Sequence, residues 1–371
     1  MADIALSPYY GKEEEFLGSE KTPFVWLAMG GVQGRVVQPF EYALNDLCNL
    51  LTFTYYPSFF DNVRGKFVRG IKNTSGNAEV IQGVSRPPTG RQRLARGISR
   101  VTSRTFDKVS LIPKDRRLPE PDLLFVVELY ERVADLKEFS CPKAIYAGDV
   151  HVNLDRYFDI AHAEEYDYVF VGEKDYIPIF KERGCKNVYW LPPGTEPRIT
   201  YGPRLPTKWD VCFVGTVYSG HPREKLLKKL QESFSTCAAT GVFLRDMSAI
   251  LRSSKIVFNR SYGSDLNPRV FDGMSAGSLV LTDRSTNGLL DLFKEDYHLA
   301  CYGDESEMLQ KAKEYLGNDK RREEVATRGQ AEVLAKHTYV HRMVDVLDKC
   351  LGFDARPLAK RLPAHNLAEF A

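Results

Sequence analysis

The chain has 371 residues, of which 51 are Lys or Arg and 49 are Asp or Glu, so its formal net charge is +2 at pH 7. A hydrophobic content of 43% is enough for packed cores and excludes a disordered or coiled-coil protein. No apolar run approaches the roughly 18 residues of a membrane span, and residues 1–20 lack the pattern of a secretion signal. At about 100–200 residues per domain, this length predicts two domains or one large barrel.

Short apolar runs rich in Val, Phe and Tyr alternate with helical stretches, a pattern typical of buried parallel strands. The predicted strands of a first series are 24–29, 50–55, 123–129, 144–146, 168–171 and 188–191. A second series comprises 211–214, 255–259 and 278–282 and ends in a charged helical region over 305–351. Residues 192–208 contain five prolines, which resist helices and sheet ladders, and form the predicted hinge. We therefore expect α/β domains at 1–200 and 201–347, with a tail at 348–371.

The seven cysteines are dispersed and never form a C-x-x-C pair, which indicates neither a disulfide framework nor a thiolate zinc site. A reducing, cytoplasmic location is expected. His337 and His341 have helical i,i+4 spacing, but no glutamate completes a metalloprotease pattern. We expect that pair on a surface helix, and no metal.

The positive charge is concentrated in residues 64–117, which hold 14 Lys or Arg and three acidic residues. This segment carries +11 and the rest of the chain −9. Arg93, Arg96, Arg100 and Arg104 recur at helical spacing and predict one basic helix face. That face is either solvated or a surface for a polyanion such as a phosphorylated glycan, an anionic membrane surface or nucleic acid.

Ligands of open parallel sheets bind beyond the carboxyl ends of the strands. The first predicted strand ends in a glycine-rich turn at 30–34, where Gly31 either lets the backbone approach an oxygen-rich ligand or only forms a tight turn. In the second series, Asn267 suits a helix N-cap, Pro268 the first helical position and Gly277 the C-terminal cap.

The N-terminus of that predicted helix favours a phosphate or diphosphate, and Arg269 adds a charge-assisted donor. Asp272, one turn further on, can accept hydrogen bonds from two ribose hydroxyls. Together these features describe a nucleotide-sugar site. The alternative is that Asn267 only caps the helix and Arg269 pairs with Asp272 at i,i+3.

The ordered motifs Asn267-x-Arg269-x-Phe271-Asp272, Ala276-Gly277, Leu281-Thr-Asp283 and Gly288 to Phe293 resemble the C-terminal domain of CgeB-like (spore-maturation) glycosyltransferases, relatives of the family 4 enzymes. The resemblance covers about 210–347. It implies a GT-B fold, in which two Rossmann-like α/β domains with parallel sheets face each other across a cleft. Residues 201–347 would bind the donor, a nucleoside-diphosphate sugar and most simply a UDP-sugar, and residues 1–200 the acceptor.

By position, the resemblance assigns donor binding to Gly215, Thr216, Asn259 and Asn267 together with Arg269. Arg223 would steady the departing diphosphate, and Asp272 matches the second carboxylate of the family 4 E-x7-E pattern, which binds ribose. Ser264 stands where the first carboxylate belongs, with Asp265 beside it. The stretch 230–247 leaves little room for the usual strand and helix.

In the first domain, Asp149 and His151 follow the strand near 143–146. The resemblance implies that His151 meets the donor sugar and that Asp149 orients it or acts as the base of an inverting reaction. The alternative is a turn cap and a surface histidine. Glu128 and Glu173, at other strand ends, are candidates for acceptor contact.

The leading expectation is a metal-independent hexosyl- or pentosyltransferase without a cofactor, acting on a glycan, protein or lipid-linked hydroxyl. The first alternative is a transferase that glycosylates hydroxylated bases in DNA, with the arginine face on the phosphate backbone. The second is a non-catalytic, glycosyltransferase-like structural protein.

Overall fold

The computed structural model describes residues 22–30, 38–55, 66–67, 70–73, 108–110, 120–129, 132–217, 219–284, 287–360 and 362. The chain divides into two compact units. Unit 1 contains the described residues up to Val171, Tyr176–Trp190 and Met343–Leu358. Unit 2 contains Gly172–Asp175, Leu191–Arg342 and the described residues from Ala359 onward.

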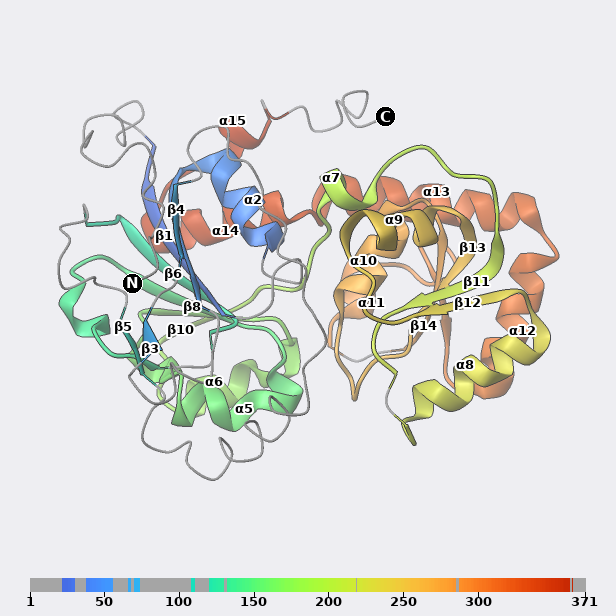
Figure 1. Cartoon of the computed structure of the whole chain (residues 1–371), viewed down its shortest axis with the longest axis horizontal. Helices are drawn as coiled ribbons and strands as arrows, with labels where there is room; N and C mark the ends of the chain where they lie inside the picture. Colours follow the sequence, from blue (N-terminus) through green and yellow to red (C-terminus); the bar gives the residue numbers. More distant parts are fainter. Residues whose placement is uncertain are drawn as a thin grey trace, which may run out of the picture. The chain divides into compact units, whose positions relative to one another are not determined.

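Unit 1 is built on a sheet with the strand order β10-β9-β8-β6-β1-β2-β4 (Figure 1). The strands are β1 (Phe24–Gly30), β2 (Asn49–Tyr55), β4 (Gly70–Asn73), β6 (Leu123–Val127), β8 (Lys143–Ala147), β9 (Tyr168–Val171) and β10 (Asn187–Trp190). Neighbours pair in parallel except for β4, which is antiparallel to β2. A separate small sheet joins β3 (Lys66–Phe67), β5 (Lys108–Ser110) and β7 (Arg132–Val133).

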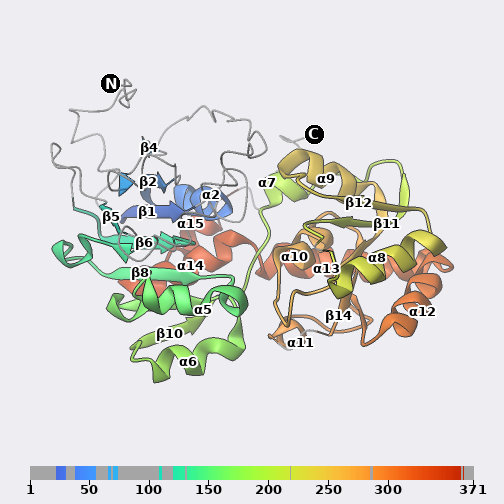
Figure 2. The same ribbon diagram turned by 60° about the horizontal axis from the view of Figure 1, so that its bottom comes forward.

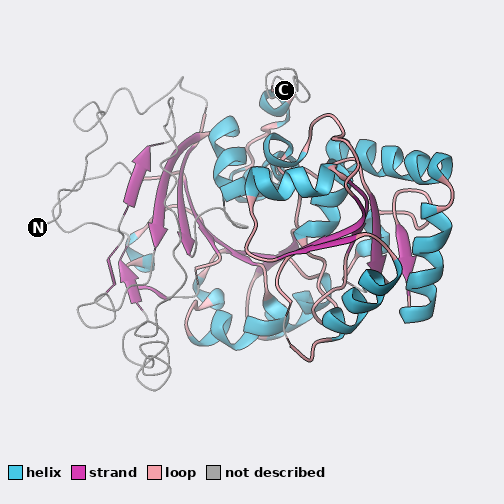
Figure 3. Cartoon of the chain, turned by 45° about the vertical axis from the view of Figure 1, so that its right-hand side comes forward, coloured by secondary structure: helices cyan, strands magenta, loops and turns pink. Residues whose placement is uncertain are grey.

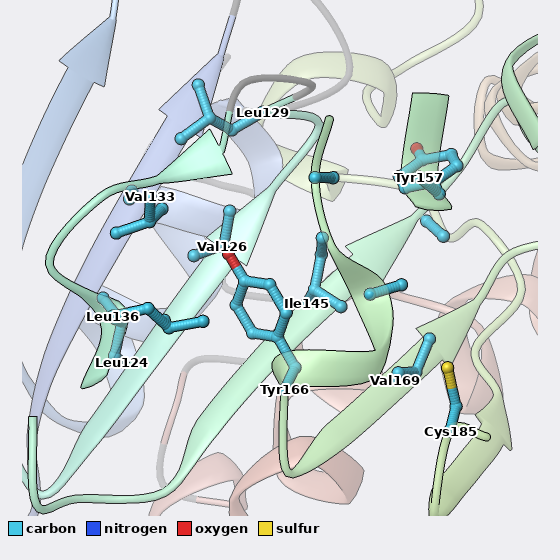
Figure 4. Packing of buried hydrophobic residues seen from close by; sticks show 14 of the residues in the cluster. Leu124, Val126, Leu129, Val133, Leu136, Ile145, Tyr157, Tyr166, Val169 and Cys185 are labelled. Carbon is cyan, nitrogen blue, oxygen red and sulfur yellow. The ribbon is translucent and has the colours of Figure 1, made fainter. Parts of the chain in front are cut away.

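Helices cover both faces of the unit 1 sheet, because its strands are apolar on both sides. The helices are α2 (Gln38–Leu47), α5 (Val150–Asp159), α6 (Ile177–Glu182), α14 (Tyr339–Leu351) from Met343 onward, and α15 (Arg356–Ala359). On one face, Val126, Ile145 and Val169 pack with Tyr157 of α5 and Tyr166, as Figure 4 shows. On the other, the ring of Phe40 in α2 lies 4.9 Å from that of Tyr146. Three-residue 3-10 helices lie at Leu136–Glu138, Ala163–Glu165 and Lys174–Tyr176.

Unit 2 contains an all-parallel sheet with the order β12-β11-β13-β14-β15. The strands are β11 (Trp209–Val214), β12 (Thr236–Ala239), β13 (Ser254–Phe258), β14 (Leu279–Asp283) and β15 (Ala300–Tyr302). The helices are α7 (Pro197–Thr200), α8 (Pro222–Ser233), α9 (Leu244–Arg252), α10 (Pro268–Ser275), α11 (Leu289–Leu292), α12 (Glu305–Leu316) and α13 (Asp319–Lys336). Figures 2 and 3 show the helices packed around this sheet.

The two faces of the unit 2 sheet pack differently. One face forms an apolar cluster with α8, α12 and α13, in which Phe213, Phe258 and Tyr302 are buried. On the other, α10 approaches the strands closely at Gly273, where a Cβ would lie 2.8 Å from Cγ2 of Val280. The close approach fixes α10 against β14, so the start of this helix is held at the carboxyl edge of the sheet.

Two Rossmann-like domains with mainly parallel sheets confirm the predicted fold class. The boundaries differ from the prediction, because Leu191–Arg342 form one unit and α14 from Met343 onward belongs to the other. The proline segment is hydrogen-bonded into unit 2: the Arg342 guanidinium donates to the carbonyls of Pro192 at 2.9 Å and Pro193 at 3.0 Å.

Two further expectations were wrong. Residues 230–247 contain the strand β12 and the first residues of α9, so this stretch does have room for a strand and the start of a helix. His337 is not on a surface helix but ends α13 with 7% of its surface exposed, packed against the rings of Phe271 and Phe293.

None of the helices that the structure describes has the length and apolar character of a membrane span.

Candidate functional site

The carboxyl edge of the unit 2 sheet gathers most of the predicted donor-side residues. Gly215 follows β11, Asn259 follows β13, and α10 begins at the same edge (Figure 1). As predicted, Asn267 is the N-cap of α10: its Oδ1 accepts from the Arg269 N–H at 3.2 Å, and Gly277 has φ +74° after the helix. His221 caps α8 in the same way, because its Nδ1 accepts from the Arg223 N–H at 3.1 Å.

Two arginines meet over one aromatic ring at this edge. The guanidinium carbon of Arg269 lies 4.3 Å and that of Arg223 5.3 Å from the centroid of Phe213. Arg223 donates from Nη1 to the Thr216 carbonyl at 2.7 Å and from Nη2 to the Arg260 carbonyl at 2.6 Å. These two acceptors are backbone carbonyl groups, and they hold the guanidinium group in place.

Arg269 turns toward β11 and away from Asp272. Its Nε donates to the Val214 carbonyl at 2.7 Å and its Nη1 to Asn259 Oδ1 at 2.6 Å. Its Nη2 lies where a Cβ on residue 215 would be, so glycine is required there. Among the described residues Arg269 has no ion pair and Nη2 has no hydrogen-bond acceptor. The alternative in which Arg269 only pairs with Asp272 along the helix is therefore wrong.

The neighbourhood of the two arginines is electropositive. Burial, followed by the positive charge of Arg223, lowers the pKa of Arg269 to about 9, so it stays charged at neutral pH. Burial together with Arg223 and Arg260 also lowers the pKa of His221. Two adjacent cations repel each other, and an anion between them removes that repulsion. The arrangement is suited to a diphosphate.

Asp272 faces the opposite way, toward the segment before α7. Its Oδ1 accepts from the Thr195 hydroxyl at 2.9 Å, and no other described residue donates to this carboxylate. Burial raises the pKa of Asp272 to about 7, while the Thr195 hydrogen bond and the charge of Arg269 oppose the shift. A carboxylate with one oxygen still without a donor can accept a ligand hydroxyl.

The loop between β13 and α10 is held by its own polar contacts. Arg260 pairs with Asp283, whose Oδ1 also accepts from the Ser261 N–H at 2.8 Å. The Tyr262 N–H donates to Asp265, so this carboxylate closes a turn. The Tyr262 ring stacks on His221 with centroids 4.8 Å apart. Ser264, at the position of the absent first carboxylate, accepts through Oγ and its carbonyl from Asn287.

In unit 1, Glu128 and Gly148 lie at the carboxyl ends of the adjacent strands β6 and β8. Glu128 has φ +52°, a left-handed conformation that costs a non-glycine residue about 1–3 kcal/mol and occurs often at functional sites. Its Oε1 lies where a Cβ on Gly148 would be, so a side chain at residue 148 would displace the carboxylate.

Asp149 and His151 continue this edge at the start of α5. Asp149 occupies the N-cap position, but its side chain makes no capping hydrogen bond, which differs from the turn-cap alternative. Desolvation raises the pKa of Asp149, and the positive charge of a protonated His151 opposes the shift. Glu173 is 3% exposed and, as predicted, follows a strand end, that of β9 beside β8, although it belongs to unit 2.

Several predicted residues lie outside the part that the structure describes: Gly31 and the arginine stripe of Arg93, Arg96, Arg100 and Arg104. Conversely, sequence reasoning missed Phe213, which supports both arginines, and Thr195, which binds Asp272. The strand position of Phe213 gave no signal for that role.

In the described residues, no group of three or more His, Cys, Asp and Glu is arranged to hold a metal ion.

Residues 209–348 match a protein-family model described as glycosyl transferase-like. This segment contains the arginine pair and Asp272. No curated protein matches the chain significantly.

Solved structures with similar folds cover most of the chain. A sucrose-phosphate synthase from Thermosynechococcus elongatus has a TM-score of 0.53 at 10% identity, covering 88% of this chain and 99% of that one. Anabaena Alr3699/HepE in complex with UDP and glucose has a TM-score of 0.56 at 11% identity, covering 88% of this chain and 100% of that one. A glycosyltransferase from Rickettsia africae has a TM-score of 0.51 at 9% identity, covering 92% of this chain and 99% of that one. The structural neighbours are GT-B glycosyltransferases, and at these identities they establish the fold alone.

Proposed function

We propose that the protein is a glycosyltransferase that uses a UDP-sugar without a metal ion. The observation that carries this proposal is the arginine pair at the carboxyl edge of unit 2, two guanidinium groups that lie over Phe213 and donate to backbone carbonyls. Such an edge is where open parallel sheets bind ligands, and the N-terminus of α10 adds a further positive field. The glycosyl transferase-like match over 209–348 and the UDP complex of a protein with a similar fold support the choice of donor.

In this proposal, Arg223 and Arg269 bind the diphosphate and Asp272 accepts a hydrogen bond from the ribose. As the bond between the anomeric carbon and the diphosphate breaks, negative charge grows on the leaving oxygen, and the two guanidinium groups stabilise it. This charge is what a divalent metal ion neutralises in other transferases, so the arginines make a metal unnecessary. The motif Asn267-x-Arg269-x-Phe271-Asp272 further supports a relationship to the CgeB-like branch.

We assign the acceptor chemistry to unit 1. The acceptor hydroxyl must lose its proton as its oxygen attacks the anomeric carbon, and a carboxylate beside that hydroxyl can accept the proton. Asp149, an exposed carboxylate at the start of α5, and Glu128, whose Oε1 is close to Gly148, both fit that role, and His151 is two residues from Asp149. Seven cysteines that all remain thiols are compatible with the expected cytoplasmic location.

The test is a screen of UDP-sugars with the purified full chain in the presence of EDTA. Calorimetry measures binding, and release of UDP, with and without a set of glycan and lipid-linked acceptors, measures turnover. We expect one UDP site per chain, chelator-insensitive, and UDP release for at least one sugar. Binding that EDTA abolishes contradicts the metal-free site, and tight binding without any UDP release supports a non-catalytic protein instead.

A further inference from the structure

A line of buried hydroxyl groups leads to Asp272 from the segment that precedes and contains α7. The Thr195 hydroxyl donates to Asp272 Oδ1 at 2.9 Å and lies 2.9 Å from the Thr200 hydroxyl, which in turn lies 2.7 Å from that of Ser275. All three hydroxyl residues are at most 1% exposed. These hydroxyls are shielded from solvent, so they depend on partners within the protein.

Each hydroxyl has a single hydrogen, so the Thr195 hydroxyl that donates to Asp272 can only accept from its other neighbours. The Thr200 hydroxyl has two acceptors within reach, the Glu196 carbonyl at 3.1 Å and the Thr195 oxygen at 2.9 Å. With either acceptor for Thr200, the hydrogen of Thr195 remains on Asp272, because a charged acceptor makes the stronger hydrogen bond.

The backbone of Thr195 is fixed on both sides. Its N–H donates to the His337 carbonyl at 3.0 Å, and its carbonyl accepts from the Tyr339 N–H at 3.0 Å. A Cβ on the preceding Gly194 would lie only 3.0 Å from that same His337 carbonyl, so the strand-like pairing is close. Thr195 cannot follow a displaced Asp272, and the hydroxyl therefore defines where Oδ1 stays.

The charged groups that act on Asp272 are few. Within the described residues they are Arg269 on the same helix, which favours the ionised form, and Glu196 beside Thr195, which disfavours it. Glu196 is itself paired with Arg198, whose Nε lies 2.6 Å from Oε1. The hydrogen bond from Thr195 is the largest effect that favours ionisation of the carboxyl.

We propose that Thr195 is a positioning residue for nucleotide binding, whose hydroxyl occupies Oδ1 of Asp272 so that Oδ2 is available to a ribose hydroxyl. The inference rests on the proposed function for the identity of the ligand. The proposal adds Thr195, in the segment before α7, to the residues that determine nucleotide binding. The backbone pairing of Thr195 with His337 and Tyr339 then determines the position of the Asp272 carboxylate on α10.

The test compares Thr195→Val, which keeps the shape and removes the hydroxyl, with Thr195→Ser, which keeps the hydroxyl. Thr236→Val is the matched control, because its hydroxyl donates to the Phe234 carbonyl at the start of β12, away from the carboxyl edge. Carboxyl 13C NMR titration of the ligand-free protein, assigned with Asp272→Asn, reports the pKa of Asp272. Calorimetry at pH 7.5 compares UDP with 2′,3′-dideoxyuridine diphosphate.

We expect Thr195→Val to raise the pKa of Asp272 by about one unit and to weaken UDP binding roughly three- to tenfold. Binding of the dideoxy nucleotide to Thr195→Val should weaken less than twofold. The Thr195→Ser and Thr236→Val proteins should match the wild type in UDP affinity and in the pKa of Asp272. An unchanged pKa in a folded Thr195→Val protein overturns the proposal, as does an equal loss for both nucleotides, which indicates a merely structural role. If the wild-type protein binds no UDP, the proposed function fails, while the NMR titration still decides whether Thr195 controls Asp272.

Discussion

Replacing Arg269 with methionine removes the cation while leaving an unbranched side chain to cover Phe213. In the wild type, Nε and Nη1 are engaged by the Val214 carbonyl and Asn259 Oδ1, whereas Nη2 has no acceptor among the described residues. A diphosphate that binds beside Gly215 would take up that donor. The substitution should therefore weaken ligand binding more than it weakens folding.

The magnitude follows from the kind of interaction lost. A hydrogen bond to a charged group contributes about 1.5–3 kcal/mol, which corresponds to a roughly 10- to 150-fold loss of UDP affinity at about 1.4 kcal/mol per factor of ten. Folding changes less, because the loss of two partly buried acceptor contacts is offset by relief of the repulsion between Arg269 and Arg223. Arg269→Lys should fall in between, since an ammonium cannot reproduce the guanidinium fork.

The assay is calorimetric titration with UDP at pH 7.5 in EDTA, together with the melting temperature of each ligand-free variant. Arg252→Met is the control: its guanidinium donates to the Pro203 carbonyl at 2.9 and 2.6 Å, and it lies at the end of α9, just before the amino end of β13. It removes the same charge without touching the carboxyl edge. An Arg269→Met protein that binds UDP within twofold of the wild type refutes the reasoning about the arginine pair.

Three other predictions address the remaining groups. Asp149→Asn and His151→Ala should lower kcat about 100-fold while leaving UDP affinity within twofold, and an equal loss in both quantities places them outside the reaction. Affinity for UDP-glucose, whose diphosphate does not titrate in this range, should rise about tenfold from pH 6 to pH 8, because Asp272, with a pKa of about 7, binds ribose best when ionised; Asp272→Asn should abolish that rise. Neutralising Arg93, Arg96, Arg100 and Arg104 should leave UDP affinity unchanged and flatten the salt dependence of binding to duplex DNA or anionic vesicles, whereas wild-type binding at every salt concentration identifies a solvated face.

Local signals in the sequence carried most of the fold. The buried strands of both units are continuous apolar runs, and α10 is delimited by Asn267, Pro268 and Gly277, whose effects do not depend on distant contacts. β12 was missed because Thr236–Ala239 is an edge strand with partly exposed residues and weak apolar character. An edge strand pairs with one neighbouring strand only, here β11, and its side chains are less buried, so its sequence need not be apolar.

The composition of the site was easier to predict than its connections. Arg223, Arg269 and Asp272 were identified by position, but the direction of Arg269 depends on Val214, 55 residues away. The partner of Asp272 is Thr195, 77 residues earlier, in a segment whose prolines and glycines indicated only a hinge. Arg342 binds Pro192 across 150 residues. Such contacts follow from the packed structure and leave no periodic pattern in the sequence.

The most direct test of the central claim is the position of the diphosphate in a crystal structure of the UDP complex grown in EDTA. We predict both phosphates at the carboxyl edge of the unit 2 sheet, beside Gly215 and within hydrogen-bond distance of the Arg223 and Arg269 guanidinium groups, with a ribose hydroxyl on Asp272. A diphosphate bound elsewhere, or one that leaves Arg269 unmoved and uncontacted, contradicts the account.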